Sequence, residues 1–471
     1  MNGHPILFLP IVDWHFRRQR PQQLARCFAR SGAQVFYGDL RLAADPPPPR
    51  QVESGIWRLT LGGDPRLDPY RDQLDAGSVE AALASLSALA AEHPLEGLWT
   101  IVQLPFWLPL AEAVRGTFGG ALHFDCMDDL SAFADHADRT AEEAALARTA
   151  DLVTVSSERL HARLAPHSRT CAVVRNGCDP EHFGPAAARP APAGRIVLGF
   201  FGGIHEWFDV DLVAALARLR PEWEIWLAGD TYRGEVDALR ALPNVRFLGE
   251  LAYADLPRVA SAFDVGILPF KVTPLTEAAD PVKVYEMLAA GLPVVAVDLP
   301  ELRRLAPLVA LARTPEEFAA RVDEALAEPL SLRETRRQAA RRCSWVERFL
   351  ELRRAMDEVA GGVPRCRPEP TRQALGLHHG GYEAADLHGR LTHLEAVERE
   401  GARLRTERCS IAEQLDRVQA EAARLAAEVE RIEADRLGLE REVARVTSSR
   451  AWRLARKVRS LTPGRPGRAR D

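Results

Sequence analysis

A lysine and a glutamate near the start of one predicted helix are the first residues whose types and spacing suggest chemistry. They are Lys283 and Glu286, in the stretch DPVKVYEMLAAG at residues 280–291. Residues three apart lie on one face of a helix. The helix dipole disfavours a cation in the first turn, so Lys283 at this position indicates an anion, such as a phosphate, beside the helix N-terminus. The alternative interpretation is a surface ion pair.

The same stretch carries the signals that begin and end a helix. Asp280 is a residue type that caps helix N-termini, and Pro281 suits the first helical position. Gly291 is a typical residue to end the helix. An apolar strand at 294–297 is expected to follow directly.

Two further stretches of this region hold residues that suit a phosphate. Gly202 and Gly203, in FFGGIHEWFD, would let backbone amides approach an anion, although a plain tight turn also explains a glycine pair. Lys271 and Thr276, in LPFKVTPLTEAADP, lie on the loop that leads into the helix with Lys283. The order of the three stretches along the chain predicts one anion-binding region.

Strand-like and helix-like segments alternate over the first 360 residues, which is typical of a parallel sheet with helices on both faces. The predicted strands are 6–12, 33–39, 100–105, 121–125, 151–157, 195–203, 223–230, 245–250, 263–270 and 292–298. The predicted helices are 21–32, 209–219, 233–241, 254–262 and 281–290, with 315–360 mostly helical.

The pattern stops and restarts near residue 190, which predicts two domains. The fold class is therefore α/β, with two tandem doubly wound (Rossmann-like) domains followed by a long α-helical coiled coil. The predicted segments are an N-terminal domain at 1–190, a C-terminal domain at 191–360, a linker at 361–382, the coiled coil at 383–447 and a basic tail at 448–471. Ligands of doubly wound domains bind at the carboxyl ends of the strands, so a cleft between the domains is the expected site.

An apolar residue recurs at every seventh position from Val397 to Val446, which indicates a coiled coil. Arg408 and Arg436 interrupt the second apolar position, so a single solvated helix is the alternative. The heptads predict a homo-oligomer formed through residues 387–446.

Composition excludes several classes of protein. The 471 residues carry a formal net charge of −5, which argues against a nucleic-acid-binding protein. The seven cysteines are scattered without a C-x-x-C pair, so neither a zinc site nor a redox pair is indicated. No apolar run is long enough to span a membrane, and we expect a cytoplasmic protein. Basic and apolar residues mix at 450–461, which predicts peripheral contact with the anionic inner face of the cytoplasmic membrane; a disordered basic end is the alternative.

The order of these motifs resembles a known family. A strand ending in Gly-Gly, then LAGD, NVRFLGEL, FDVGILPF and DPVKVYEMLAAGLPVVA resembles the donor-binding domain of GT-B-fold glycosyltransferases of the retaining, glycogen-synthase-like superfamily. RNGCDPEHF resembles the segment before the interdomain linker of that family, and CSWVERFLEL its closing helix. WHFRRQRPQQLARCFARSGAQVFY and FDCMDD resemble a bacterial branch that acts in cell-surface polysaccharide synthesis. The resemblance covers about residues 1–360.

The resemblance implies roles for the residues of the second domain. Glu286 matches the second glutamate of the E-x7-E motif, which holds the ribose of the nucleotide, whereas the first glutamate is replaced by Ala278. The family's basic pair after the glycine turn is missing, so Lys283 and Lys271 are the available cations for the diphosphate. Gly249 matches the region that packs the nucleobase.

The resemblance is less specific for the first domain. Asp128 and Asp129, in FDCMDD, stand where the family often places a histidine, and their carboxylates could contact sugar hydroxyls, serve as a base or cap the next helix. A basic group follows the first strand, either as a solvated turn or facing the acceptor side, where it would suit a lipid-linked diphosphate. Its members are Trp14, Arg17, Arg18 and Arg20.

The resemblance implies a glycosyltransferase that moves a hexose from a nucleotide diphosphate sugar to a surface-glycan acceptor such as a polysaccharide or lipopolysaccharide, with retention of configuration. The partners would be the nucleotide sugar and a glycan or lipid-linked glycan, and we expect no cofactor and no metal. Two alternatives are a sugar-nucleotide 2-epimerase, which shares the two-domain architecture, and a non-catalytic scaffold in which the coiled coil organises partner enzymes.

Overall fold

The computed structural model describes residues 4–130, 139–184, 194–231 and 235–360, together with the single residues Arg445 and Lys457. The chain divides into two compact units, Met1–Leu377 and His378–Asp471. The predicted linker lies outside the described residues, as do nearly all of the predicted coiled coil and basic tail. Within the described part of the chain, no helix is long and apolar enough to cross a membrane.

The N-terminal half builds an eight-stranded sheet in the order β3-β4-β2-β1-β5-β6-β7-β8. All pairs are parallel except β3 with β4. The strands are β1 (Ile6–Leu9), β2 (Val35–Gly38), β3 (Arg50–Glu53), β4 (Ile56–Leu59), β5 (Trp99–Val102), β6 (Leu122–Cys126), β7 (Leu152–Val155) and β8 (Cys171–Val173).

The C-terminal half builds a six-stranded, fully parallel sheet in the order β11-β10-β9-β12-β13-β14. This is the strand order of a doubly wound dinucleotide-type fold, and it reverses direction between β9 and β12. The strands are β9 (Ile196–Phe201), β10 (Trp223–Ala228), β11 (Val245–Gly249), β12 (Val265–Leu268), β13 (Val294–Val297) and β14 (Val309–Ala312).

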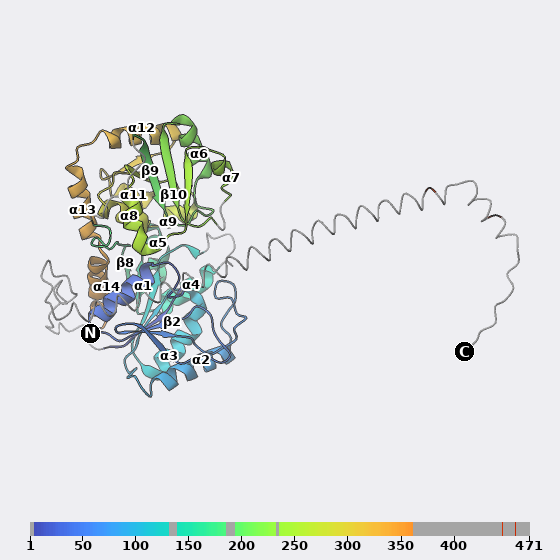
Figure 1. The fold of residues 1–471 in the computed structure, drawn as a ribbon. Helices are drawn as coiled ribbons and strands as arrows, with labels where there is room; N and C mark the ends of the chain where they lie inside the picture. Colours follow the sequence, from blue (N-terminus) through green and yellow to red (C-terminus); the bar gives the residue numbers. More distant parts are fainter. Residues whose placement is uncertain are drawn as a thin grey trace, which may run out of the picture. The chain divides into compact units, whose positions relative to one another are not determined.

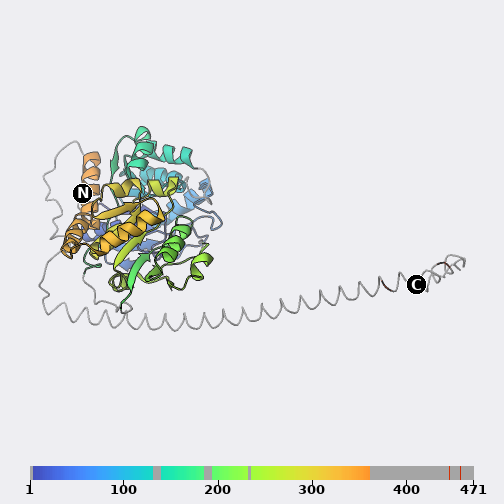
Figure 2. The same ribbon diagram turned by 90° about the horizontal axis from the view of Figure 1, so that it is seen from above.

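Helices surround both sheets, as the ribbon and its turned view show (Figure 1, Figure 2). The N-terminal half holds α1 (Arg20–Arg30), α2 (Ala76–Leu89), α3 (Leu108–Phe118), α4 (Thr140–Thr149), α5 (Glu158–Leu164) and the 3-10 turns η1 (Pro105–Trp107) and η3 (Ala165–His167). The C-terminal half holds η4 (Tyr253–Asp255), α6 (Val210–Leu219), α7 (Asp237–Arg240), α8 (Leu256–Ala260), α9 (Pro274–Ala278), α10 (Val282–Ala289), α11 (Pro300–Arg303), α12 (Pro315–Leu326) and α13 (Leu332–Arg342).

The last described helix, α14 (Trp345–Ala360), returns to the N-terminal half and lies beside α1 (Figure 1). Phe349 meets Phe28 of α1 edge to face, with ring centroids 4.9 Å apart. Trp345 and Met356 belong to the same buried cluster. The chain crossing back in this way ties the two domains together through apolar packing, because the helix follows the C-terminal sheet but buries its apolar face against the N-terminal one.

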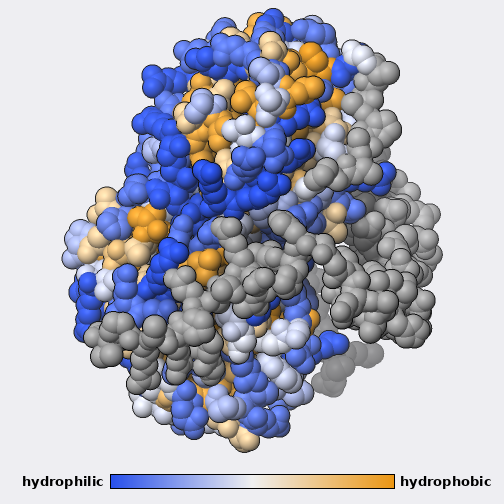
Figure 3. All heavy atoms as spheres, turned by 90° about the vertical axis from the view of Figure 1, so that its left-hand side faces the viewer, coloured by the Kyte–Doolittle hydropathy of each residue, from blue (hydrophilic) through white to orange (hydrophobic). Residues whose placement is uncertain are grey.

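The surface of the protein is mostly hydrophilic on the face drawn in Figure 3. Hydrophobic residues on this face show mainly over the C-terminal domain at the top. The large hydrophobic side chains that are exposed among the described residues are Phe16, Leu219, Val272 and Leu330. Phe16 follows β1 and Val272 follows β12, so two of the four lie on loops at the carboxyl ends of strands.

The structure confirms an α/β fold with two parallel sheets. Four strands, β3, β4, β8 and β14, were not predicted from the sequence. Each of them pairs at or beside the outer edge of a sheet, and all four have half-buried or exposed positions, which weakens the apolar pattern that predicts a strand.

Candidate functional site

Helix α10 presents Lys283 in its first turn, as predicted. The helix starts at Val282, and its N-cap, Pro281, has no side chain that can accept from the free amides. Lys283 makes no salt bridge or hydrogen bond through its ammonium with any residue that the structure describes. The positive end of the helix dipole and a lysine therefore coincide, and no carboxylate among the described residues forms a salt bridge there, which favours an anion at this point.

Asp280 does not cap α10, so that expectation was wrong. Its carboxylate accepts hydrogen bonds from the Asn176 amide and the Tyr285 hydroxyl, both at 2.7 Å, and forms an ion pair with Arg304 at 3.1 Å. The Asn176 side chain donates in turn to the Asp280 carbonyl at 2.7 Å. Burial raises the pKa of Asp280 to about 6, against the opposing charge of Arg304. These contacts hold the residues just before α10 against the NGCD segment of the N-terminal half.

The glycine pair after β9 lies against two cations. A Cβ on Gly202 would come within 2.8 Å of the Lys283 Cε, and a Cβ on Gly203 within 3.0 Å of an Arg17 guanidinium nitrogen. Gly202 also has a φ of +145°, a conformation that side chains rarely adopt. Glycine is required here because the turn must leave room for the lysine and the arginine.

Glu286 is buried one turn along α10 from Lys283. It is 3% exposed, and its Oε2 has no hydrogen-bond partner among the residues that the structure describes. Burial raises the pKa of Glu286 to about 7, although the charge of Lys283 opposes the shift. Within the same described part of the chain, the buried hydroxyl of Tyr253 also has no hydrogen-bond partner. Unsatisfied buried polar atoms are uncommon in folded proteins, so these two oxygens are candidates for hydrogen bonds to a ligand.

The other predicted donor-side residues differ in their surroundings. Gly249 is exposed at the end of β11, with a φ of +70°, and its carbonyl accepts from Gly229 at 2.8 Å. Lys271 is exposed on the loop after β12. Thr276 is buried, and its hydroxyl donates to the Lys271 carbonyl at 2.5 Å within the capping box of α9. Thr276 is therefore a local structural residue, not one exposed to a donor.

Arg17 and Arg18 reach across from the N-terminal half to the C-terminal one. Arg17 forms ion pairs with Asp230, after β10, and with Glu250, after β11, the second at 2.9 Å. The Arg18 guanidinium lies 4.9 Å from the ring centroid of Tyr253. The loop after β1 thus contacts the loops at the carboxyl ends of the C-terminal strands.

Two residues of the predicted acceptor-side group are buried, which corrects that prediction. Trp14 is buried against Tyr37, with ring centroids 5.1 Å apart. Arg20 is 1% exposed and forms a bidentate pair with Asp125, the closest approach being 2.8 Å. Both lie too deep to face an acceptor, because their polar and aromatic groups are used within the N-terminal core.

Asp128 and Asp129 follow β6 and have different environments. Asp128 is half-buried, and no hydrogen bond of its carboxyl is found among the described residues. Burial raises the pKa of Asp128 to about 6, with Asp129 adding to the shift and Arg20 opposing it. Asp129 lies 3.5 Å from the Arg163 guanidinium. Asp128 is therefore the carboxyl better suited to exchange a proton near neutral pH.

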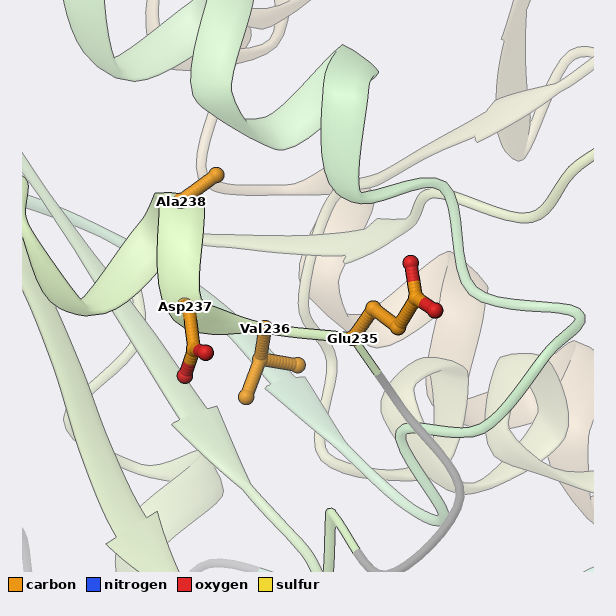
Figure 4. A pocket seen from close by; sticks show the side chains of 4 residues that line it. All are labelled: Glu235, Val236, Asp237 and Ala238. Carbon is orange, nitrogen blue, oxygen red and sulfur yellow. The ribbon is translucent and has the colours of Figure 1, made fainter. Parts of the chain in front are cut away.

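A separate hollow lies at the start of α7, lined by Glu235, Val236, Asp237 and Ala238 (Figure 4). None of the residues predicted to bind the donor lines it. Across the described ranges, no group of three or more His, Cys, Asp or Glu residues could hold a metal ion.

Residues 195–328 match a family model described as "Glycosyl transferases group 1". This segment contains the glycine turn, Asp230, Glu250 and the whole of α10. A teichuronic acid biosynthesis protein of Bacillus subtilis (strain 168), assigned there as the glycosyltransferase TuaH, is 34% identical over 177 residues, which is 35% of this chain. The chain spans 44% of the length of that curated relative.

Solved structures share the fold at low sequence identity. Sucrose-phosphate synthase from Thermosynechococcus elongatus superimposes with a TM-score of 0.61 and 16% identity, covering 76% of this chain and 99% of that one. Anabaena HepE in complex with UDP and glucose gives a TM-score of 0.56 and 17% identity over 75% and 99% of the two chains. The fold therefore resembles that of GT-B glycosyltransferases. The matched family model and the curated relative are both those of glycosyltransferases.

Sequence reasoning missed the contacts that join distant segments. The Asn176–Asp280 pair, the contact of Arg17 with Asp230 and Glu250, and the unpartnered Tyr253 hydroxyl have no local signal in the sequence. The LAGD and NVRFLGEL stretches were noted for their order, but the acids inside them could be connected to Arg17 only once the two halves of the chain were placed together.

Proposed function

We propose that this protein is a glycosyltransferase that moves a sugar from a nucleoside diphosphate sugar to a surface-glycan acceptor. The observation that carries the proposal is the state of α10, where the buried Glu286 carboxyl has an unpartnered oxygen and the Lys283 ammonium has no salt bridge among the described residues. A nucleoside diphosphate supplies both complements, since ribose hydroxyls donate hydrogen bonds and phosphates are anionic. Structures of HepE were solved with UDP and with UDP-glucose, which agrees with this type of donor.

In the proposed reaction, the chain stabilises the diphosphate as it leaves. Lys283 and the free amides at the N-terminus of α10 would oppose the negative charge that develops on the leaving group. The glycine turn has no Cβ at Gly202, where one would meet the Lys283 Cε at 2.8 Å, and it would let the phosphate approach the backbone. Glu286 would hold the ribose and so fix where the sugar lies. We assign no resident cofactor or metal to this reaction, in line with the family resemblance.

Asp128 is the residue that we assign to the sugar end of the site. A carboxyl with a pKa of about 6 can accept a proton from an acceptor hydroxyl or hold a sugar hydroxyl near neutral pH. The resemblance implies retention of anomeric configuration and a polysaccharide acceptor, and the relation to a protein assigned to teichuronic acid biosynthesis agrees with such an acceptor.

The test is a turnover assay with a panel of nucleotide sugars chosen by thermal shift. Release of nucleoside diphosphate that depends on an added glycan acceptor supports a transferase. An acceptor-independent change of the sugar to its 2-epimer or to free sugar would indicate the epimerase instead. Binding of nucleotide sugars without any turnover, across the panel and several glycan acceptors, would indicate the non-catalytic scaffold.

We also propose, on the sequence alone, that residues 387–446 form a homo-oligomeric coiled coil and that residues 450–461 contact anionic membrane. Light scattering on the full chain and on residues 1–365 tests the first proposal, and equal monomeric masses would contradict it. Sedimentation with anionic and neutral vesicles, using the full chain and a form that ends at Val446, tests the second. Equal recovery of both forms in the supernatant with anionic vesicles at low salt would contradict it.

A further inference from the structure

The loop that follows β1 places a cation beside a turn that has none of its own. The turn reads FFGGIHEWFD and contains no lysine or arginine. Arg17, from the other half of the chain, has a guanidinium nitrogen 3.0 Å from the point where a Cβ of Gly203 would lie. Lys283 approaches the preceding glycine, Gly202, to 2.8 Å by the same measure. An arginine and a lysine from different domains therefore lie against neighbouring residues of one turn.

Arg17 is held in this position by two acids of the C-terminal domain. Its guanidinium forms ion pairs with Asp230 and with Glu250, the latter at 2.9 Å. The Glu250 side chain is 57% exposed, so its ion pair is open to water and weak. Asp230 has a second partner in His205, whose Nε2 lies 2.9 Å from its Oδ1. Asp230 would therefore keep a hydrogen bond if the arginine turned toward another anion.

We infer that Arg17 is the second phosphate-binding cation of the donor site, supplied by the N-terminal domain. The inference rests on the proposed function, because it concerns the diphosphate of the same nucleotide sugar. A diphosphate carries more charge than Lys283 alone can neutralise. A guanidinium is suited to the remaining oxygens, since its planar fork of donors can bind two of them at once.

The inference has a consequence for how the domains cooperate. Asp230 and Glu250 hold Arg17 at the turn in the protein without nucleotide, and the donor phosphates then compete with these acids for the same guanidinium. The diphosphate site is complete only while the β1–α1 loop rests on the C-terminal domain. Binding of the diphosphate thus draws on both domains, because Arg17 belongs to the N-terminal domain and Lys283 to the C-terminal one.

A purely structural role for Arg17 is the alternative that the experiment must separate. As a clamp between domains, Arg17 would act through its ion pairs, and removing Glu250 would then weaken nucleotide binding as removing Arg17 does. As a ligand for phosphate, Arg17 would act directly, and Glu250→Gln would leave the affinity unchanged or increase it. Arg159 pairs with Glu277 between α5 and α9, so Arg159→Gln is a matched loss of another cross-domain ion pair.

The experiment begins with calorimetric titration of the full chain with UDP, GDP and ADP. The nucleotide that binds most tightly is then titrated into each variant. Binding of the corresponding nucleoside is measured by ligand-observed NMR. We expect Arg17→Gln to lower the affinity for the nucleoside diphosphate by about tenfold or more, and the affinity for the nucleoside by less than about twofold. Arg17→Lys should fall between wild type and Arg17→Gln. Glu250→Gln and Arg159→Gln should bind as tightly as wild type or, for Glu250→Gln, more tightly.

Wild-type affinity in Arg17→Gln would overturn the inference, and a loss of affinity in Lys283→Ala under the same conditions would leave the proposed function standing. Equal losses in Arg17→Gln and Glu250→Gln, or an equal loss for nucleoside and diphosphate, would show a clamp and would also overturn it. Failure of wild type to bind any of the three nucleotides would overturn the inference and the proposed function together.

Discussion

Two buried carboxylates, one from each domain, are in opposite states. Asp125, on β6, is fully buried and accepts hydrogen bonds from Arg20, from Gln103 at 3.0 Å and from Thr154 at 2.7 Å. Glu286, on α10, is also buried, yet its Oε2 has no hydrogen-bond partner in the described ranges of the chain. Burial alone would raise both pKa values, but the charge and hydrogen bonds of Arg20 lower the pKa of Asp125 to about 2, while the pKa of Glu286 rises to about 7.

The contrast separates a structural carboxylate from one that is suited to a ligand. Residues of the protein itself supply the hydrogen bonds of Asp125, so a substitution there is expected to lower the stability of the fold. If Glu286 holds the donor as proposed, a substitution there is expected to weaken ligand binding. The predictions below test this division at Arg20, Asp128, Lys283 and Glu286.

The largest effect on stability is expected for Arg20→Ala. Removing Arg20 leaves Asp125 buried without its counter-charge and frees the Val174 carbonyl, which Arg20 contacts at 2.8 Å. Loss of one partner of a buried ion pair costs about 3–5 kcal/mol of unfolding free energy. Urea denaturation measures it. The control is Arg66→Ala, whose pair with Asp64 is exposed and should leave the midpoint unchanged; a similar midpoint for both variants would contradict the structural role of Arg20.

The next effect is expected on turnover in Asp128→Asn. If Asp128 exchanges a proton with a sugar hydroxyl, the amide should lower kcat by about 100-fold. Its raised pKa, about 6, means that the folded protein loses stability as pH rises through 6. Asp128→Asn should therefore be at least as stable as wild type at pH 7.5, which separates a catalytic loss from unfolding. The comparison variant is Asp129→Asn, beside Arg163; an equal loss of turnover in both would remove Asp128 from its assigned role.

Lys283→Ala is expected to weaken binding without changing the fold. Loss of a charge-assisted contact to phosphate should cost about 1.5–3 kcal/mol, or at least tenfold in the affinity for a nucleoside diphosphate. The matched variant is Lys271→Ala, which removes an exposed lysine on the adjacent loop and should cost less. Calorimetry measures both. Unchanged affinity in Lys283→Ala at wild-type thermal stability would refute the assignment of the phosphate site.

The features that the sequence predicted correctly are those that depend on neighbouring residues in one segment. Lys283 and Glu286 were found because they are three residues apart on one helix, and the strand β13 was found because VVAV is continuously apolar. The strand β3, RQVE, was missed because it is antiparallel at a sheet edge and largely exposed, so neither alternation nor an apolar run announces it.

The sequence could not predict which polar residues satisfy one another. Arg20 was placed on the acceptor side because it follows a strand among other basic residues, but its partner Asp125 lies 105 positions further along the chain. Arg17, three residues earlier in the same cluster, reaches Glu250 over 233 positions. Composition and spacing are the same kind of evidence for both arginines; only the packing of β6 and β11 around them separates a core residue from one at the anion site.

The smallest effect, and the most direct test of the unsatisfied carboxyl, is the pH dependence of donor affinity. If ribose hydroxyls donate to Glu286, the nucleotide sugar binds the ionised form. With a pKa of about 7, that form is scarce at pH 6 and predominant at pH 8. The affinity should therefore rise by about tenfold between these pH values. A nucleotide sugar is the right titrant because its diphosphate is esterified at both ends and does not titrate in this range, unlike a terminal phosphate with a pKa near 6. Glu286→Gln should bind the nucleotide sugar more weakly than wild type at pH 8, and its affinity should not change with pH.

The pH dependence of stability has the opposite sign. A carboxyl whose pKa is raised from 4.5 to about 7 contributes stability at low pH that is lost as pH rises through 7, so Glu286→Gln should have the higher Tm at pH 8. A flat wild-type profile, or the same slope in both proteins, would show that Glu286 is buried without meeting the ligand.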